Sequence, residues 1–123
     1  MDEIIITQKI LIDRVKDLMC SAFEGGSNYW YFIQEEHGEE AEYTWEKPFE
    51  GGYLMISDIQ ADDPQLKDKP VRLDLQAIEK GLKLLAASED YRHHWCDFIR
   101  ENDDATTADV FLQFCVFGDV VYS

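Results

Sequence analysis

The segment His93-His94-Trp95-Cys96 is the part of this sequence that most resembles a set of metal ligands. The apolar periodicity around it predicts a helix, on which adjacent residues diverge by about 100°. His93 and His94 therefore do not converge on one ion, and only His93 and Cys96 share a face. No CxxC or HExxH spacing supplies further ligands. The sequence therefore predicts no metal site.

No other segment carries the pattern of a catalytic or cofactor site. The sequence lacks a nucleophile motif, a phosphate-binding glycine loop and a dinucleotide fingerprint. The acidic loop around Asp58, Asp62 and Asp63 lacks the central glycine and the closing glutamate of a calcium loop. Carboxylates are too numerous for one pair to stand out as acid and base. We therefore predict a non-enzymatic protein without catalytic residues or a cofactor.

The three cysteines, Cys20, Cys96 and Cys115, all fall in predicted helices beside large apolar residues. An odd number without a pairing pattern argues against a disulfide framework. Free thiols among apolar neighbours usually behave as small core residues. The sequence therefore predicts unpaired, buried thiols and a reducing compartment.

The most unusual segment is EGGSNYWY at positions 24–31, in which two glycines precede polar and aromatic residues. One interpretation is a helix end that leads directly into a core strand. The other is the wall of a concave pocket, in which Asn28 selects polar groups and an aromatic ring stacks on the ligand. On the second interpretation the candidate binding residues are Glu24, Ser27, Asn28, Tyr29 and Trp30.

A second polar turn, ENDDATT at positions 101–107, separates two apolar helical segments. Ordinary helix capping explains these residue types. Their alternative role is ligand or partner binding, for which the candidates are Asp103, Asp104 and Thr106.

The chain is strongly acidic, with 26 Asp and Glu against 11 Lys and Arg and a net charge of −15. Residues 24–63 hold eleven acidic residues and one basic residue, a net charge of −10. Proteins that bind the phosphate backbone of a nucleic acid need clustered Lys and Arg, so direct binding of nucleic acid is not expected. The block favours a basic protein surface as partner, with Glu35, Glu36, Glu39 and Glu40 as candidate contacts. Solubility alone is the other explanation.

Short apolar or alternating segments predict the strands. They span residues 4–6, 29–33, 42–46, 53–57 and 70–73, and we expect a short edge strand at 120–122. The acidic segment around Gly38 is expected to form a loop or hairpin turn, and residues 58–69 a surface loop.

Apolar residues that recur three or four positions apart predict four helices. The first spans residues 8–24, between Thr7 as a cap and the pair Gly25-Gly26. The second follows Asp74 as N-cap. Its buried positions are expected to be Leu75, Ile78, Leu82 and Leu85.

The third helix begins at the acidic segment 88–90, which suits a helix N-terminus. Its apolar stripe consists of Tyr91, Trp95, Phe98 and Ile99. In the fourth helix Thr106 and Asp109 imitate a capping box, and the helix ends at Gly118.

Together these elements predict one α+β domain over residues 1–123, a small, mostly antiparallel sheet packed against about four helices. With 46% hydrophobic and 13% aromatic residues, the chain can form one compact core. No run approaches eighteen apolar residues, so no membrane span is predicted. The acidic N-terminus lacks the basic region of a signal peptide. We expect a cytoplasmic protein.

Two motifs of this sequence resemble small, functionally unassigned proteins of tailed phages and prophages. The first is FEGGSNYW at positions 23–30, and the second is ENDDATTADVFLQ at positions 101–113, followed by Gly118 and Tyr122. The resemblance covers both ends of the chain and leaves residues 34–70 unplaced. It implies a phage accessory protein that acts in the bacterial host cytoplasm, and such proteins often counter host defence.

Two function classes follow from these observations. The first is a non-enzymatic acidic protein that inhibits a bacterial defence component by occupying its basic surface. The second is a protein that sequesters a small nucleotide signal, for which a basic pocket has to form locally. A third and weaker option is a metal-dependent hydrolase that uses Asp and Glu.

Overall fold

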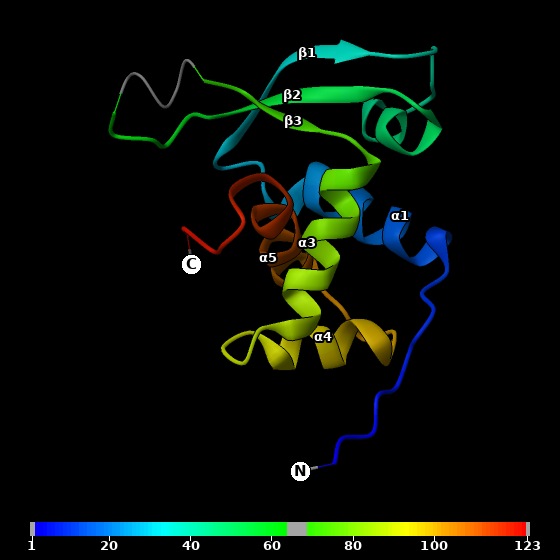
Figure 1. Cartoon of the computed structure of the whole chain (residues 1–123). Coiled ribbons are helices and arrows are strands. Elements are labelled where there is room, and N and C mark those ends of the chain that lie inside the picture. The colour runs from blue at the N-terminus through cyan, green and yellow to red at the C-terminus, as the bar shows by residue number, and fades with distance from the viewer. Residues whose placement is uncertain (1, 64–68, 123) are drawn as a thin grey trace.

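The computed structural model describes residues 2–63 and 69–122, and it confirms the predicted α+β class. A three-stranded antiparallel sheet lies across one end of a layer of helices (Figure 1). Residues 64–68, which belong to the predicted loop 58–69, lie outside the described residues.

The sheet has the strand order β1-β2-β3, formed by Tyr31–His37, Tyr53–Asp58 and Val71–Leu73. The strands predicted at 53–57 and 70–73 are confirmed, while the one predicted at 29–33 begins later and extends to His37. Leu54 pairs with Leu73 and Ile33 with Ile56, so apolar side chains share the face that meets the helices. The register shifts between Ile33 and Glu35.

The helical layer consists of α1 (Ile12–Ser21), α3 (Leu75–Ala87), α4 (Arg92–Ile99) and α5 (Ala105–Phe117). A π-helical turn, η1 (Ala22–Gly26), continues α1. The second, third and fourth predicted helices are confirmed at α3, α4 and α5. The first is shorter than predicted, because α1 starts at Ile12 and Thr7 caps nothing.

α5 is the central helix, since every residue from Thr107 to Val116 is buried. A helix that is apolar on all sides is expected at the centre of a core. α3 approaches it closely at Gly81, where a Cβ atom would lie 2.3 Å from Cys115 Sγ. Gly81 therefore sets the spacing between these two helices.

Three of the predicted strands are wrong. Residues 44–46 belong instead to η2 (Thr44–Glu50), a 3-10 helix that contains Pro48 and is capped by Gly51 with a φ of 88°, and residues 42 and 43 form a bend before it. Residues 4–6 are extended but pair with no described strand, because no sheet edge lies beside them. Residues 120–122 donate their backbone N–H groups to side chains rather than to a strand, Val120 to Asp119 and the other two to Gln113.

The N-cap predicted for α3 is confirmed, and the one predicted for α5 is not. Asp74 accepts from the backbone N–H of Ala77 at 2.9 Å and so begins α3. For α5 the cap is Asp104, whose Oδ1 accepts from the Thr107 N–H at 2.9 Å. The capping box predicted for Thr106 and Asp109 is wrong, since Asp109 is buried and turned to other partners.

Candidate functional site

The EGGSNYWY segment and the second motif meet at one buried carboxylate, Asp109 of α5. Its Oδ1 accepts hydrogen bonds from Ser27 Oγ and from Trp30 Nε1, both at 2.7 Å. Its Oδ2 accepts from the Tyr29 hydroxyl at 2.5 Å and from Gln113 Nε2 at 3.2 Å. We call these residues, Ser27, Tyr29, Trp30, Asp109 and Gln113, the Asp109 cluster. It contains no cation, so hydrogen bonds alone stabilise the carboxylate.

Gln113 extends this cluster to the C-terminal segment. Its Oε1 accepts from the N–H groups of Val121 and Tyr122, each at 2.8 Å, and its Nε2 donates to the Tyr122 carbonyl at 2.9 Å. The Tyr122 hydroxyl donates to Asp58 Oδ2 at 2.6 Å. Burial, together with Asp58, raises the pKa of Tyr122. The side-chain amide of Gln113 thus holds the tail against the end of β2.

The turn itself is shaped by its closeness to α5. A Cβ atom at Gly26 would lie 2.3 Å from the carbonyl oxygen of Ala105, so only glycine fits there. Ser27 and Trp30 are fully buried, and Trp30 packs on Phe117 with ring centroids 4.9 Å apart. Burial and the hydrogen bond to Asp109 raise the pKa of Tyr29, which therefore stays protonated.

This geometry favours the first interpretation of the EGGSNYWY segment, a helix end that leads into the core. The side-chain polar groups of Ser27, Tyr29 and Trp30 already donate hydrogen bonds to Asp109, so they are not available to bind a ligand. Asn28 is exposed, and no hydrogen bond joins it to another described residue. Of the five candidates in this segment, Glu24, Asn28 and Tyr29 are exposed, and the Tyr29 hydroxyl is bonded to Asp109.

The candidates of the second turn also have structural roles. Asp103 accepts from Arg14 Nη2 at 2.8 Å, and the same Arg14 nitrogen donates to the Phe98 carbonyl at 2.8 Å. Asp104 caps α5, and its hydrogen bond from the Thr107 N–H lowers the pKa of the carboxyl. Thr106 is exposed. The turn therefore fastens α1 to α4 and α5, which fits capping better than binding.

The tertiary structure brings Glu24 of η1 near the exposed Tyr43, whose chain neighbours Glu42 and Glu46 are also acidic. Glu42, then Glu24, raise the pKa of the Tyr43 phenol. None of the three carboxylates forms an ion pair with a cation of the described chain. We call these four residues, Glu24, Glu42, Tyr43 and Glu46, the acidic face. Tyr43 is 44% exposed.

Next to the acidic face the chain leaves a polar group unsatisfied. Tyr43 stacks on Trp45 with the two rings 5.8 Å apart and nearly parallel, at 11°. The buried indole N–H of Trp45 finds no hydrogen-bond partner among residues 2–63 and 69–122, and the Ser57 hydroxyl is the other such group. A buried donor without a partner costs about 1–3 kcal/mol.

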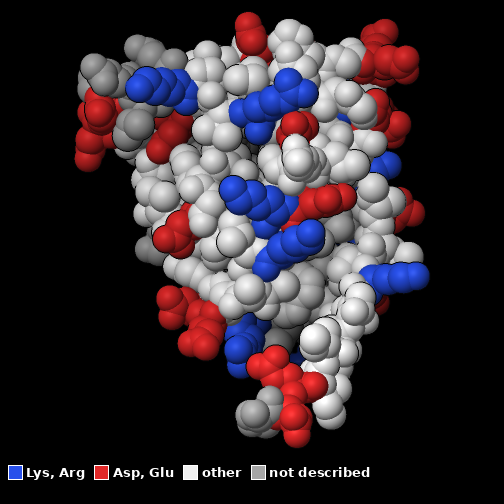
Figure 2. Space-filling model, in the orientation of Figure 1, with Lys and Arg blue, Asp and Glu red and all other residues white. Residues whose placement is uncertain are grey.

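The predicted contacts Glu35, Glu36, Glu39 and Glu40 are all exposed, at the end of β1 and in the turn after it. Glu36 pairs with Lys47 at 3.0 Å, and Glu35 lies 3.4 Å from His37. Figure 2 shows carboxylates gathered at the upper right, where β1 ends, while Lys and Arg occupy the middle of the same view. Further carboxylates lie along the left side and at the bottom of the same view, so the upper right is one of several acidic regions on this face.

The histidines and cysteines do not assemble a reactive site. His94 Nδ1 lies 2.8 Å from the Thr107 hydroxyl, and burial lowers the pKa of His94. Burial and Glu24 raise the pKa of the Cys20 thiol, while burial alone raises that of Cys115. In the part of the chain that the structure describes, no three His, Cys, Asp or Glu side chains are placed to hold a metal ion.

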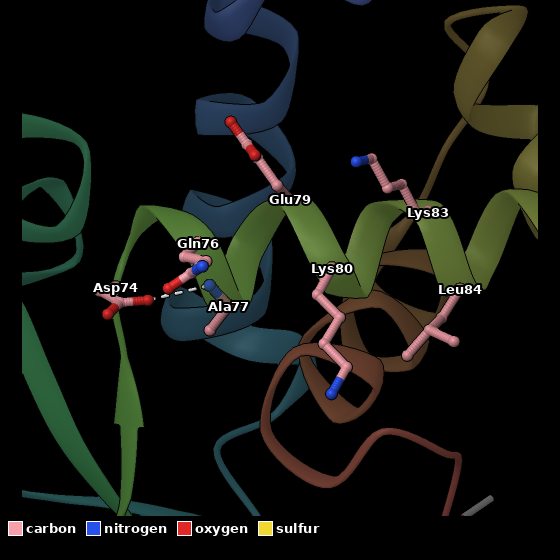
Figure 3. Close-up of a pocket in the computed structure, with 7 residues that line it drawn as sticks. All are labelled: Asp74, Gln76, Ala77, Glu79, Lys80, Lys83 and Leu84. Carbon is pink, nitrogen blue, oxygen red and sulfur yellow. Dashed lines mark hydrogen bonds between the residues drawn. The ribbon is translucent and has the colours of Figure 1, made fainter.

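A broad hollow of about 670 Å³ lies over α3 and carries two lysines (Figure 3). Lys80 and Lys83 extend to opposite sides of the helix, so their ammonium groups do not converge on one anion. Asp74 and Glu79 also line the hollow. Its geometry does not favour the phosphate-bearing ligand of the second function class.

Sequence reasoning missed Asp109, Gln113 and Arg14, which hold the two motifs in place. Asp109 is four residues before Gln113, so the two share one face of α5. A carboxylate and an amide on one side of an otherwise apolar helix is the signal that could have identified the cluster. The partners of Asp109 in the EGGSNYWY segment lie about eighty positions away, which no local pattern reveals.

Comparison of this chain with protein-family models, with curated proteins and with solved structures finds no match. Among the described residues no helix is both long and apolar enough to cross a lipid bilayer.

Proposed function

We propose that this protein is a non-enzymatic binding protein that docks through its acidic face on a basic protein surface. The observation that carries the proposal is the exposed ring of Tyr43 beside three carboxylates, Glu24, Glu42 and Glu46, whose charges act on its phenol. An aromatic anchor at the centre with charged groups around it is a common arrangement of interface hot spots. The carboxylates would steer and orient a basic partner.

The acidic face also departs from what stability alone would favour. Like charges without cations repel one another, and the neighbouring Trp45 N–H is buried without a partner in the described chain. In the Asp109 cluster, by contrast, the buried polar groups of Ser27 and Trp30 are paired with the carboxylate. Natural proteins tend to break such rules at functional sites, where binding compensates the cost.

The class of partner follows from the charge and from the phage resemblance. A nuclease or restriction factor of the bacterial host presents a basic channel for nucleic acid, and carboxylates can occupy it in place of phosphates. The proposed function is therefore inhibition of a bacterial defence component in the host cytoplasm.

The test is a pull-down from bacterial lysate with the whole chain as bait, followed by assay of any retained nuclease. Glu42→Gln with Glu46→Gln, and separately Tyr43→Ala, should abolish retention. The matched control is Glu89→Gln with Asp90→Asn, which removes the same charge at an exposed site before α4. It should retain the partner.

Retention should also weaken as salt increases, because exposed charges are screened. Equal retention by the acidic-face variants and the control would contradict the proposal, and so would indifference to salt. A rise in melting temperature with cyclic dinucleotides or ADP-ribose derivatives would favour the nucleotide-sequestering alternative instead.

A further inference from the structure

The N-terminal arm, residues 2–10, extends away from the helical layer past α4 (Figure 1). The side chains of Ile4, Ile5 and Ile6 are 91%, 87% and 84% exposed. Within the described part of the chain, the arm forms no hydrogen bond and no ion pair. An extended β-branched segment with unpaired backbone groups is a template for pairing with another strand.

A slot of about 410 Å³ separates the arm from the helical layer. Ile6, Gln8 and Ile10 line it from the arm. Leu82, Ala86 and Trp95 are its apolar residues on α3 and α4, and Glu79 and Lys83 of α3 line it as well. Because side chains alternate along an extended chain, Ile4 belongs to the same face as Ile6 and Ile10. An apolar surface of this extent on a protein usually marks an interaction site.

The charges of the arm indicate which strand fits beside it. Glu3 and Lys9 lie at equal distances along the chain from Ile6. A second arm laid antiparallel about Ile6 therefore places Glu3 opposite Lys9 at both ends, and opposite charges across strands are favourable. The open edge of β1 is a poorer partner, because its Glu35 and Glu36 would repel the acidic start of the arm.

We infer that two copies of this chain associate by antiparallel pairing of their N-terminal arms about Ile6. Ile6 then faces its own counterpart, Ile4 faces Gln8, and Ile5 faces Thr7. The face of the two-stranded ribbon that carries Ile4, Ile6 and Ile10 lies against the slots of both copies. It covers the apolar side chains of Leu82 and Trp95 there. Each copy contributes the same residues, as a two-fold interface requires.

The surface available is sufficient for such a dimer. The described chain exposes 7943 Å², and a standard interface takes about 800 Å² per partner, or roughly a tenth of a small protein's surface. Ile4, Ile5 and Ile6, each more than four-fifths exposed, are apolar surface that such an interface could bury. The acidic face lies on η1 and η2, so this association is independent of the proposed function.

Charge reversal on the whole chain tests the register. Glu3→Lys and Lys9→Glu, each alone, place like charges opposite at both ends, and each should weaken dimerisation about tenfold. The double variant restores both pairs and should return the dissociation constant to within about twofold of the original. Sedimentation equilibrium at protein concentrations up to about 1 mM measures this constant.

Ile6→Asp tests the two-fold centre, because it places two carboxylates face to face. It should weaken the dimer by at least about 100-fold. Val121→Asp, at an exposed apolar site on the other end of the chain, is the matched control and should leave the dimer intact. A monomeric original chain over this range would overturn the inference. A dimer indifferent to Ile6→Asp, or one that the double charge reversal fails to restore, would overturn it as well.

Discussion

The Asp109 cluster and the acidic face contain the same residue types, carboxylates beside aromatic and polar side chains, yet their surroundings differ. In the cluster one buried carboxylate accepts hydrogen bonds from Ser27, Tyr29 and Trp30. In the acidic face the charges of three carboxylates act on Tyr43 without a cation, and the Trp45 N–H beside it lacks a partner in the described chain. The paired polar groups of the Asp109 cluster indicate a structural role. The unpaired groups of the acidic face support the proposal that it binds a partner.

Truncation of the cluster's largest side chain should have the largest effect. Trp30→Ala removes a fully buried ring that packs on Phe117 and donates to Asp109. We expect a loss of about 3–5 kcal/mol in the free energy of unfolding, at the upper end of this range. Chemical denaturation measures it. A variant as stable as the original chain would show that Trp30 is not part of the core.

Removal of the carboxylate at the centre of the cluster should rank second. Asp109→Ala leaves the buried donors of Ser27 and Trp30 without an acceptor. At about 1–3 kcal/mol for each donor, the expected loss is roughly 2–6 kcal/mol. Asp109→Asn keeps one acceptor and should lose less, again measured by denaturation. Equal losses for the two variants would contradict the hydrogen-bond explanation.

An exposed residue of the same turn provides the contrast. Asn28→Ala should change the free energy of unfolding by less than about 0.5 kcal/mol, because Asn28 is exposed and no described residue bonds to it. Ser27→Ala, one position earlier, removes a buried hydroxyl that donates to Asp109 and should cost about 1–3 kcal/mol. If Asn28→Ala were the more costly of the two, the assignment of Ser27 to the core and of Asn28 to the surface would be wrong.

The acidic face should respond in the opposite direction. Glu42→Gln with Glu46→Gln relieves repulsion and should raise the free energy of unfolding by a few tenths of a kcal/mol at low salt. The gain should fade as salt increases, because exposed charges are screened. Thermal unfolding at two salt concentrations checks this. A loss of stability would show that these carboxylates are structural, like Asp109.

A pH titration gives the smallest expected effect and tests burial near α5. Burial, followed by the charge of His93, lowers the pKa of His94 from its usual 6.5. As pH falls through 6.5, the unfolded chain binds a proton that the native chain does not yet bind, so stability decreases toward acid. His94→Gln should remove this part of the pH dependence between neutral pH and 6. An unchanged profile would show that His94 titrates normally.

The helical layer was largely predictable, because its signals lie within a few residues of each other. The periodicity of α3 and α5, the Asp74 cap and the Gly118 end are properties of single turns of helix. The strands were less predictable. Residues 42–46 alternate as a strand should, but Pro48 and the turn at Gly51 favour a 3-10 helix there. Residues 4–6 have strand composition but no neighbouring strand within the described chain.

The candidate site could be predicted only in part, since residue type does not reveal direction. The EGGSNYWY segment was identified as unusual, yet its sequence left two interpretations open. Asn28 and Trp30 are two positions apart, and only the tertiary structure shows that one faces solvent and the other the core. Glu24 and Glu42 are eighteen positions apart, and no pattern in the sequence indicates that both act on Tyr43.

The sequence by itself determined the α+β class, the start of α3 at Asp74, the end of α5 at Gly118, and the concentration of negative charge between residues 24 and 63. These follow from local propensity, hydrophobic period and composition, which depend on near neighbours. The tertiary structure alone decided that Asp109 is the acceptor for Ser27, Tyr29 and Trp30, which lie 82, 80 and 79 positions away. Contacts at such separations form only when the whole core packs, because they depend on how η1 and α5 approach at Gly26.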